Sequence, residues 1–497
     1  MHKLLLVTGF LLLVAASFMP EQHWESSFVK MGKNGKLEYM PDAQGNVIPD
    51  FSAVGFYKGD KPIPGVKVVT MLSPSANAQQ DIQSAINALA ARPIGKDGFR
   101  GAILLKKGRY EIPGTIHIRA SGIVLRGEGE ETILVATGNT QYPLIFVNGN
   151  GSPKELPGKV KITDAYVPVG AASFNVPAGT AFKPGDNIIV YRPATQNWIH
   201  DIKMDQIESR EGTKQWTPQE YGLQFERTIT AVKGNRIFID NPIVMAMEEK
   251  YGGGEVFPYS FEGRIKHVGI ENLNCISTYS SDTAEDHAWD AVRFNRIENG
   301  WVRNVTARYF GYSCVNLGQY AKFITVTDSR CYDAKSKITG SRRYSFNNDG
   351  QMNLVMNCET TEGRHDFITG AKVAGPNVFY NCKSSRTHAD IGPHHRWAVG
   401  TLYDNIVTDG EINVQDRGNW GTGHGWAGVT QVLWNCTVKR AAVQSPWASG
   451  KNYCIGLKGE KYQGRLPGRP DAEWEGQNKD GLIPKSLYMA QLAARRK

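Results

Sequence analysis

The stretches NLVMNCETT (353–361) and NVFYNCKSS (377–385) share one pattern: a short apolar run, then Asn, Cys and polar residues. Related runs are HVGIENLNC (267–275), NGWVRNVTA (299–307), AKFITVTDS (321–329), TLYDNIVTD (401–409) and QVLWNCTVK (431–439). Spacings of 32, 22, 31, 24, 24 and 30 residues separate the successive markers Ile270, Val302, Ile324, Val355, Phe379, Tyr403 and Leu433. One short strand in every such unit predicts a solenoid.

Each repeated run alternates apolar and polar residues, which indicates a strand with one face inward and one outward. Asn recurs at one offset of the runs, for example Asn357 and Asn381. We expect these amides to form a ladder from coil to coil at a turn.

The segment before the repeats predicts a helix followed by short strands. In QQDIQSAINALA (79–90), Ile82, Ile86 and Leu89 lie on one helical face, as in a helix that caps the open end of a solenoid. GAILLKKGRYEI, GTIHIRASGIVLRGEG and TILVATG (101–138) then indicate strands separated by Gly.

The order IQSAIN, KKGRYEI, GIVLRGEG and then Asn-punctuated coils resembles the pectate-lyase-like superfamily over residues 75–455. The resemblance implies an all-β fold, a single-stranded right-handed parallel β-helix. It also implies a function, because such proteins are mostly secreted carbohydrate-active enzymes: polysaccharide lyases, some glycoside hydrolases and phage tailspikes.

The predicted organisation has four parts. An apolar run after Lys3 indicates a signal peptide (1–17), and we therefore expect a secreted or periplasmic protein. An N-terminal extension (18–74), the β-helix (75–456) and a C-terminal tail (457–497) follow. The segment 157–260 contains two β-like stretches and is interpreted as an inserted β-rich segment, which could form one wall of a substrate groove.

Charge and cysteine content narrow the class of partner. The 497 residues carry a net charge of +9 but no Lys/Arg run of the nucleic-acid-binding type, which favours an anionic polysaccharide over nucleic acid. No later run is long enough to span a membrane, and we expect a monomer. The seven cysteines sit in apolar runs and are interpreted as buried thiols, with disulfides as the second interpretation.

Five of the 11 histidines fall between residues 365 and 424. Counted from the strand markers, Asp366 and Asp390 share the offset +11, and Lys335 has the same offset in an earlier coil. Because equal offsets stack in parallel coils, we expect a charged column of Lys335, Asp366 and Asp390, with Arg364 and His388 beside it.

The loops GPHHRWAVG (392–400) and EINVQDRGNWGTGHGWAGV (411–429) are rich in basic, aromatic and Gly residues. They predict a groove in which indoles stack on sugars and guanidinium groups bind carboxylates. The predicted substrate-binding residues are Arg396, Trp397, Arg417, Trp426 and His424.

Uronic-acid polysaccharides are cleaved by β-elimination, in which a base removes the C5 proton and the C4 oxygen leaves. A base that works near neutral pH suits His, and the substrate carboxylate must be neutralised. The predicted catalytic residues are His365, His388, His394, His395, Arg364 and Lys335. Asp366 and Asp390 would either hold Ca²⁺ or orient a histidine.

Two alternatives stay open. NNDG (347–350) and GHG (423–425) resemble polygalacturonase motifs, which would make Asp349 and Asp366 the pair of a glycoside hydrolase. The same groove could also bind a glycan without cleaving it. The Arg-x-Pro-x-x-Arg pattern of the best-known pectate lyases is missing, and no HxH or HExxH spacing favours zinc.

Overall fold

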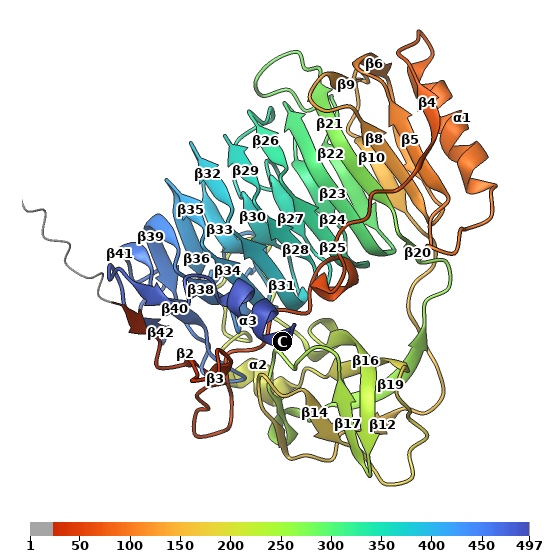
Figure 1. The fold of residues 1–497 in the computed structure, drawn as a ribbon. Coiled ribbons are helices and arrows are strands. Elements are labelled where there is room, and N and C mark those ends of the chain that lie inside the picture. Colours follow the sequence, from red (N-terminus) through yellow and green to blue (C-terminus); the bar gives the residue numbers. More distant parts are fainter. Residues whose placement is uncertain (1–22, 497) are drawn as a thin grey trace, which may run out of the picture.

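A computed structural model describes residues 23–496, so the predicted signal peptide (1–17) lies outside the described residues. Most of the strands are parallel and stack coil upon coil (Figure 1). The predicted fold, a right-handed parallel β-helix, is confirmed; parallel crossovers are almost always right-handed. Among the described helices, none is long and apolar enough to cross a membrane.

Three stacks of parallel strands form the faces of the β-helix. The first contains β4 (Val68–Leu72), β5 (Gly101–Leu105), β8 (Ile123–Gly127), β21 (Gly269–Ser277), β23 (Ile297–Arg308), β25 (Ala321–Thr327), β28 (Leu354–Met356), β31 (Ala374–Tyr380), β34 (Ala398–Asp404), β38 (Val432–Trp434), β40 (Tyr453–Ile455) and β42 (Glu473–Glu475). The second contains β6 (Gly108–Ile112), β9 (Thr132–Ala136), β21, β23, β26 (Arg330–Tyr332), β29 (Glu359–Thr361), β32 (Lys383–Ser385), β35 (Val407–Thr408), β39 (Thr437–Val443) and β41 (Lys458–Lys461). The third contains β7 (Ile116–Ile118), β10 (Pro143–Asn148), β22 (Asp290–Asn295), β24 (Ser313–Leu317), β27 (Phe346–Asn348), β30 (Phe367–Thr369), β33 (Asp390–Pro393), β36 (Glu411–Val414) and β39.

The turns between the first and second stacks carry the predicted asparagine ladder. The Asn381 side-chain amide donates to Asn357 at 2.7 Å, and the Asn435 amide donates to Asn405 at 2.9 Å. Asn357 and Asn381 have φ of 54° and 51°, a left-handed conformation that Asn tolerates better than most residues. The repeat of Asn therefore reflects both the backbone of the turn and the hydrogen bond between coils.

The interior of the β-helix is apolar and contains the seven cysteines. Phe346, Phe367, Phe379 and Tyr403 follow one another through the core, with stacked rings for Phe346–Phe367 and Phe379–Tyr403. All seven cysteines are buried and free, as the first interpretation of the sequence predicted.

Segments from both ends of the chain pack on the β-helix. Helix α1 (Ala78–Ala90) buries Ile82, Ile86 and Leu89 in the same core as the first coils, and Figure 1 places it beside β4 and β5. Residues 24–60, with β1 (Trp24–Glu25), β2 (Val29–Met31), β3 (Leu37–Tyr39) and η1 (Phe56–Gly59), lie along the first stack with α3 (Leu487–Arg495) and β43 (Leu482–Ile483). Parallel stacking continues beyond residue 456 to β42, further than the predicted tail boundary.

Residues between β10 and β20 (Ile265–Lys266) form a separate antiparallel module, seen below the β-helix in Figure 1. Its main sheet contains β11 (Lys154–Glu155), β12 (Val160–Lys161), β14 (Ser173–Asn175), β15 (Asn187–Arg192), β16 (Leu223–Lys233), β17 (Arg236–Ile239) and β19 (Glu255–Ser260). It also contains α2 (Gln196–Asp201), η2 (Pro218–Glu220), η3 (Glu249–Tyr251) and the pair β13 (Tyr166–Val167) and β18 (Met247–Glu248).

Apolar and ionic contacts attach this module to the β-helix. Trp397 of the β-helix packs edge-on against Trp198 of the module, with ring centroids 5.0 Å apart. Glu226 of β16 accepts two hydrogen bonds from Arg264, at 2.6 and 2.7 Å, and lies 3.3 Å from Lys322 of β25. The module is therefore held against the later coils, where the predicted site residues lie.

Candidate functional site

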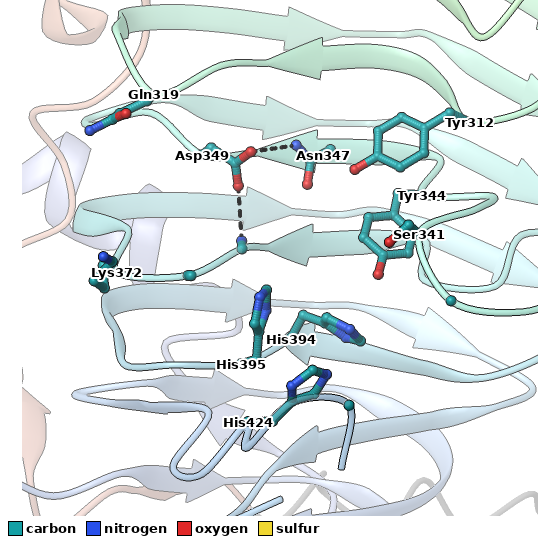
Figure 2. A pocket seen from close by; sticks show the side chains of 14 residues that line it. Tyr312, Gln319, Ser341, Tyr344, Asn347, Asp349, Lys372, His394, His395 and His424 are labelled. Atoms are coloured by element: carbon teal, nitrogen blue, oxygen red, sulfur yellow. Dashed lines mark hydrogen bonds between the residues drawn. The ribbon is translucent and has the colours of Figure 1, made fainter. Parts of the chain in front are cut away.

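A pocket of about 630 Å³ opens on the third face of the β-helix (Figure 2). Asn347 and Asp349 border it on one side, and His394, His395 and His424 border it on the other. Tyr312 and Tyr344 lie at one end and Lys372 at the other. The remaining lining residues are Gln319, Gly340, Ser341, Gly370, Ala371 and Gly421.

Three of the five clustered histidines, His394, His395 and His424, line this pocket, and a fourth, His365, packs against His394 from behind it. His394 is central: its ring centroid lies 4.5 Å from that of His365, 4.9 Å from His395 and 5.2 Å from His424. The four come from two adjacent coils and the 411–429 loop, so segments separated in the sequence bring these rings together. Tyr344 packs edge-on against both His365 and His394.

Burial keeps these imidazoles neutral. It is the largest cause that lowers the pKa of His365 to about 4, of His395 to about 3 and of His424 to about 4. Nearby cationic groups lower the pKa values further, Arg417 acting on all three. The pKa of His394 is lowered well below its ordinary value, again mainly by burial. At neutral pH all four rings therefore carry a free lone pair.

These rings also leave nitrogen atoms unpaired. Within residues 23–496, the buried Nε2 of His365 and Nδ1 of His394, His395 and His424 have no hydrogen-bond partner. Buried polar atoms are nearly always paired, so these ring nitrogens have hydrogen-bonding capacity left for water or a ligand. The Nδ1–H of His365 donates to the Asp390 carbonyl at 2.7 Å, which fixes Nε2 as its basic atom.

Guanidinium groups border the histidines in an adjoining pocket that His394 and His424 also line. There Arg417 forms an ion pair with Asp390. Burial opposes ionisation of Asp390, but Arg417 and His365 outweigh it and lower the Asp390 pKa. Arg364 lines the same pocket, and its buried Nη1 has no partner among the described residues. Arg364, which forms no ion pair among the described residues, thus has donor capacity left for an anion, and the buried Nε of Arg417 is likewise without a partner there.

Asp349 is the one carboxylate in the lining of the larger pocket as described for residues 23–496. It accepts hydrogen bonds from Asn347 at 3.0 Å and from the Gly370 amide at 3.0 Å (Figure 2). Burial raises its pKa. A chain of amides extends from this carboxylate through Asn347 and Asn316 to Asp290, two coils away.

Two predicted catalytic residues lie elsewhere. Lys335 forms an ion pair with Asp282 at 2.8 Å and lines none of the described pockets, so its predicted place in the Asp366 column is wrong. The loop between β26 and β27 shifts the register, and Ser345 takes the expected position of Lys335. His388 contacts Glu362 at 2.8 Å, also away from the pockets.

The predicted sugar-stacking role of Trp397 and Trp426 is contradicted, because both side chains are 0% exposed. They pack against the inserted module, and the Trp426 indole donates to the Ile202 carbonyl at 3.0 Å. Arg396 and Arg417, by contrast, line pockets, as does His424. Trp420 is 36% exposed beside Arg417 and is the indole that borders a pocket.

The proposed calcium ligands have other partners. Asp366 accepts hydrogen bonds from Ser345 at 2.7 Å and Thr360 at 3.0 Å; burial raises its pKa to about 6, partly offset by these bonds. It lines none of the described pockets, and Asp390 is paired with Arg417. Each of these two carboxylates is thus engaged by groups of the protein itself. Among residues 23–496, no group of three or more His, Cys, Asp or Glu is arranged to hold a metal ion.

Sequence reasoning missed Tyr344 and Lys372. Tyr344 precedes His365 by one coil in the third stack, and Lys372 precedes Arg396 by one coil, since the Lys372 amide donates to the Arg396 carbonyl at 2.9 Å. Both residues lie one coil before a predicted site residue. Aligning the coils on His365 and Arg396, instead of on the strands of the first stack, would have identified them.

No protein-family model matches this sequence, and no curated protein matches it. Solved structures resemble the chain weakly. An alginate lyase from Paenibacillus sp. has 10% identity, 83% of this chain and 99% of that chain covered, and a TM-score of 0.40. Pectate lyase Pel9A has 12% identity, 84% and 82% covered, and a TM-score of 0.38. A tailspike of Pseudomonas phage phi297 has 11% identity, 81% and 74% covered, and a TM-score of 0.34.

The names of these three proteins describe two different lyases and a phage tailspike. Identities of 10–12% with TM-scores of 0.40 or less give no information about the function of this chain. The resemblance of this chain to the pectate-lyase-like superfamily is therefore a resemblance of fold, that of a parallel β-helix.

Proposed function

We propose that this protein is an exported polysaccharide lyase that cleaves a uronic-acid-containing polymer by β-elimination. The reaction takes place in the histidine pocket, the pocket of about 630 Å³ that His394, His395 and His424 line. The observation that carries the proposal is the group of four neutral imidazoles, His365 buried and the other three partly buried, with unpaired ring nitrogens beside Arg364. Export rests on the sequence of residues 1–17, and action as a monomer is part of the proposal.

In this mechanism the uronate carboxylate binds Arg364, whose free guanidinium nitrogen neutralises the charge that opposes carbanion formation. His394 accepts the C5 proton, because its ring borders both pockets and is neutral. The electron pair of the C5–H bond forms the C4–C5 double bond as the C4–O bond breaks. Tyr344 donates a proton to the departing C4 oxygen; burial raises its pKa and keeps its hydroxyl protonated.

The bound substrate strengthens the base. An imidazole with a lowered pKa is a weak base in the empty pocket, but a carboxylate placed among the rings favours the imidazolium form. Proton transfer to His394 is thus most favourable when the anionic sugar is bound, which disfavours unproductive protonation of the free enzyme.

A glycoside hydrolase is the second candidate, and Asp349 is the observation that favours it. Its raised pKa suits a general acid. Hydrolysis requires a second carboxylate across the scissile bond, and Asp366, the predicted partner, is hydrogen-bonded away from the pocket. The lining thus supplies several bases and one acid, which fits elimination better.

The test is absorbance near 235 nm, where the new double bond absorbs, with polygalacturonate, alginate, glucuronan and glycosaminoglycans as substrates. We expect absorbance to rise, and His394→Gln to lower kcat by about 100-fold or more. His200→Gln, which changes an exposed histidine of the module, is the matched control and should keep wild-type activity.

Chain shortening at constant absorbance would refute elimination and support Asp349 as a hydrolytic acid. An EDTA arm tests calcium. We expect EDTA to leave the rate unchanged, because Asp366 and Asp390 are engaged by hydroxyl groups and Arg417. Loss of activity that added Ca²⁺ restores would contradict the assignment of charge neutralisation to Arg364.

A further inference from the structure

A second pocket, of about 310 Å³, adjoins the histidine pocket where the inserted module meets the β-helix. Ala371 and Lys372 line both pockets, so the two are continuous. The module supplies Lys214, Gln215, Glu220 and Tyr221, and the β-helix supplies Arg396 and Thr422. A polymer chain that fills the histidine pocket would therefore extend into this junction.

Two cations of this pocket stack in neighbouring coils. Lys372 and Arg396 are joined by the amide-to-carbonyl bond described above, and both have φ of 55°, in the left-handed region that costs non-Gly residues energy. Like charges at adjacent positions of parallel coils repel. Neither the left-handed backbone conformation nor the charge repulsion stabilises the fold. Binding of an anionic ligand therefore explains the presence of Lys372 and Arg396 at these positions better than stability does.

The third cation, Lys214, comes from the module, and the β-helix loop that contains Thr422 holds it in place. The carbonyl oxygen of Thr422 accepts two hydrogen bonds, one from the backbone amide of Lys214 and one from the guanidinium of Arg396, each at 3.2 Å. The loop around Thr422 therefore fixes the two cationic residues on either side of the junction.

No carboxylate neutralises these cations among the described residues: Lys214, Lys372 and Arg396 form no ion pair there. Lys372 donates one hydrogen bond, to the Glu220 carbonyl at 2.8 Å, and keeps two donors. The Glu220 carboxylate itself accepts from the Thr217 hydroxyl at 3.2 Å.

We infer that this junction is a subsite for the carboxylate of a second uronic acid, next to the sugar that the histidine pocket cleaves. The inference rests on the proposed function and adds to it a substrate class: a polymer with carboxylates on neighbouring sugars, read in part by the inserted module. Lys214, Lys372 and Arg396 are its ligands, and charge-assisted hydrogen bonds to the carboxylate supply the affinity.

The test is calorimetric binding of tetrasaccharides from polygalacturonate, alginate and glucuronan to full-length protein carrying His394→Gln, which slows turnover, with absorbance at 235 nm followed to verify that the sugars stay intact. The same tetrasaccharides with carboxyl groups reduced to alcohols are the neutral probes. We expect Lys214→Gln and Lys372→Gln each to weaken binding of the acidic probe about tenfold. Lys183→Gln, an exposed lysine of the module outside the pockets, should bind as the parent does.

The outcomes separate the subsite from the lyase activity. Wild-type elimination with unchanged affinity in Lys214→Gln and Lys372→Gln would overturn the subsite alone. Charge-dependent binding without any rise at 235 nm would support the subsite and refute the lyase. Equal loss of affinity in Lys183→Gln, or binding of none of the acidic tetrasaccharides by the parent, would also overturn the subsite.

Discussion

The buried histidines make the free energy of unfolding depend on pH. A neutral ring such as His365 is stable in the fold only while it remains deprotonated, because burial penalises its charged form. The unfolded chain binds a proton to the same ring near pH 6.5. Protonation therefore favours unfolding as the pH falls below that value.

This gives a prediction with a definite sign. The pKa of His365 is about 4 in the fold and lower than in the unfolded chain, so its contribution is complete above pH 6.5 and is lost as the pH falls toward 4. At pH 5 the loss from His365 alone is about 2 kcal/mol. Urea unfolding measures the decrease in the free energy of unfolding from pH 7 to pH 5. We expect this decrease to be about 2 kcal/mol smaller in His365→Gln than in the wild type.

His200→Gln, at a histidine whose side chain is 64% exposed, is the comparison and should keep the wild-type dependence on pH. An unfolding free energy for His365→Gln that falls with pH as steeply as that of the wild type would show that this ring is not held neutral.

Prediction from sequence succeeded at the residue scale where coils had equal length. Asp366 and Asp390 are 24 residues apart in coils without an insertion, and the pairing of Ile368 with Gly392 places them in register. The prediction for Lys335 failed because the loop from β26 in the second stack to β27 in the third is longer than the corresponding loop from β29 to β30, so a constant residue offset no longer marks the same position in each coil.

At the scale of elements, the contact between the inserted module and the β-helix determines which side chains face the pockets. Trp397 and Trp426 fill the junction, while Trp420 stays at its surface. All three lie in Gly-rich loops, and their sequence surroundings look alike. Only the packing of a module about 200 residues earlier in the chain separates them, which explains why the sequence misplaced the stacking role.

The two kinds of tryptophan should respond differently to truncation. Trp397→Ala opens a cavity in the junction and should lower the free energy of unfolding by about 3–5 kcal/mol. Trp420→Ala removes a half-exposed ring beside Arg417 and should change that free energy by less than about 0.5 kcal/mol while raising KM. Urea unfolding and initial rates on both variants measure these effects.

Wild-type stability combined with a raised KM in Trp397→Ala would reverse this assignment and restore the sequence-based one. The reverse pattern in Trp420→Ala would show that its indole supports the loop rather than the substrate.

On the scale of the whole molecule, the sequence period was sufficient to predict the β-helix because it is set by local features: alternating apolar residues and Asn in left-handed turns. The pocket was not predictable to the same extent. It depends on Tyr344 and Lys372, each one coil from a recognised residue, and on a wall from the inserted module. Such long-range contacts leave no period in the sequence.

Net charge provides the last prediction. The chain carries +9, and unpaired cations line the continuous pockets, so a polyanionic substrate is attracted both at long range and at contact. Salt shortens the range of this attraction, from about 10 Å at 0.1 M to about 3 Å at 1 M. Raising NaCl from about 0.05 to 0.5 M should therefore increase KM for a long polyuronate about tenfold and leave kcat nearly constant.

A tetrasaccharide of the same sugar should show a smaller increase in KM, because it contacts the subsites but releases fewer counterions than the polymer. Initial rates at 235 nm over a salt series measure both slopes. If the two substrates had equal slopes, the attraction would come from the pocket cations alone. If KM did not change with salt, the excess of positive charge would have no part in substrate capture, and shape would select the polymer.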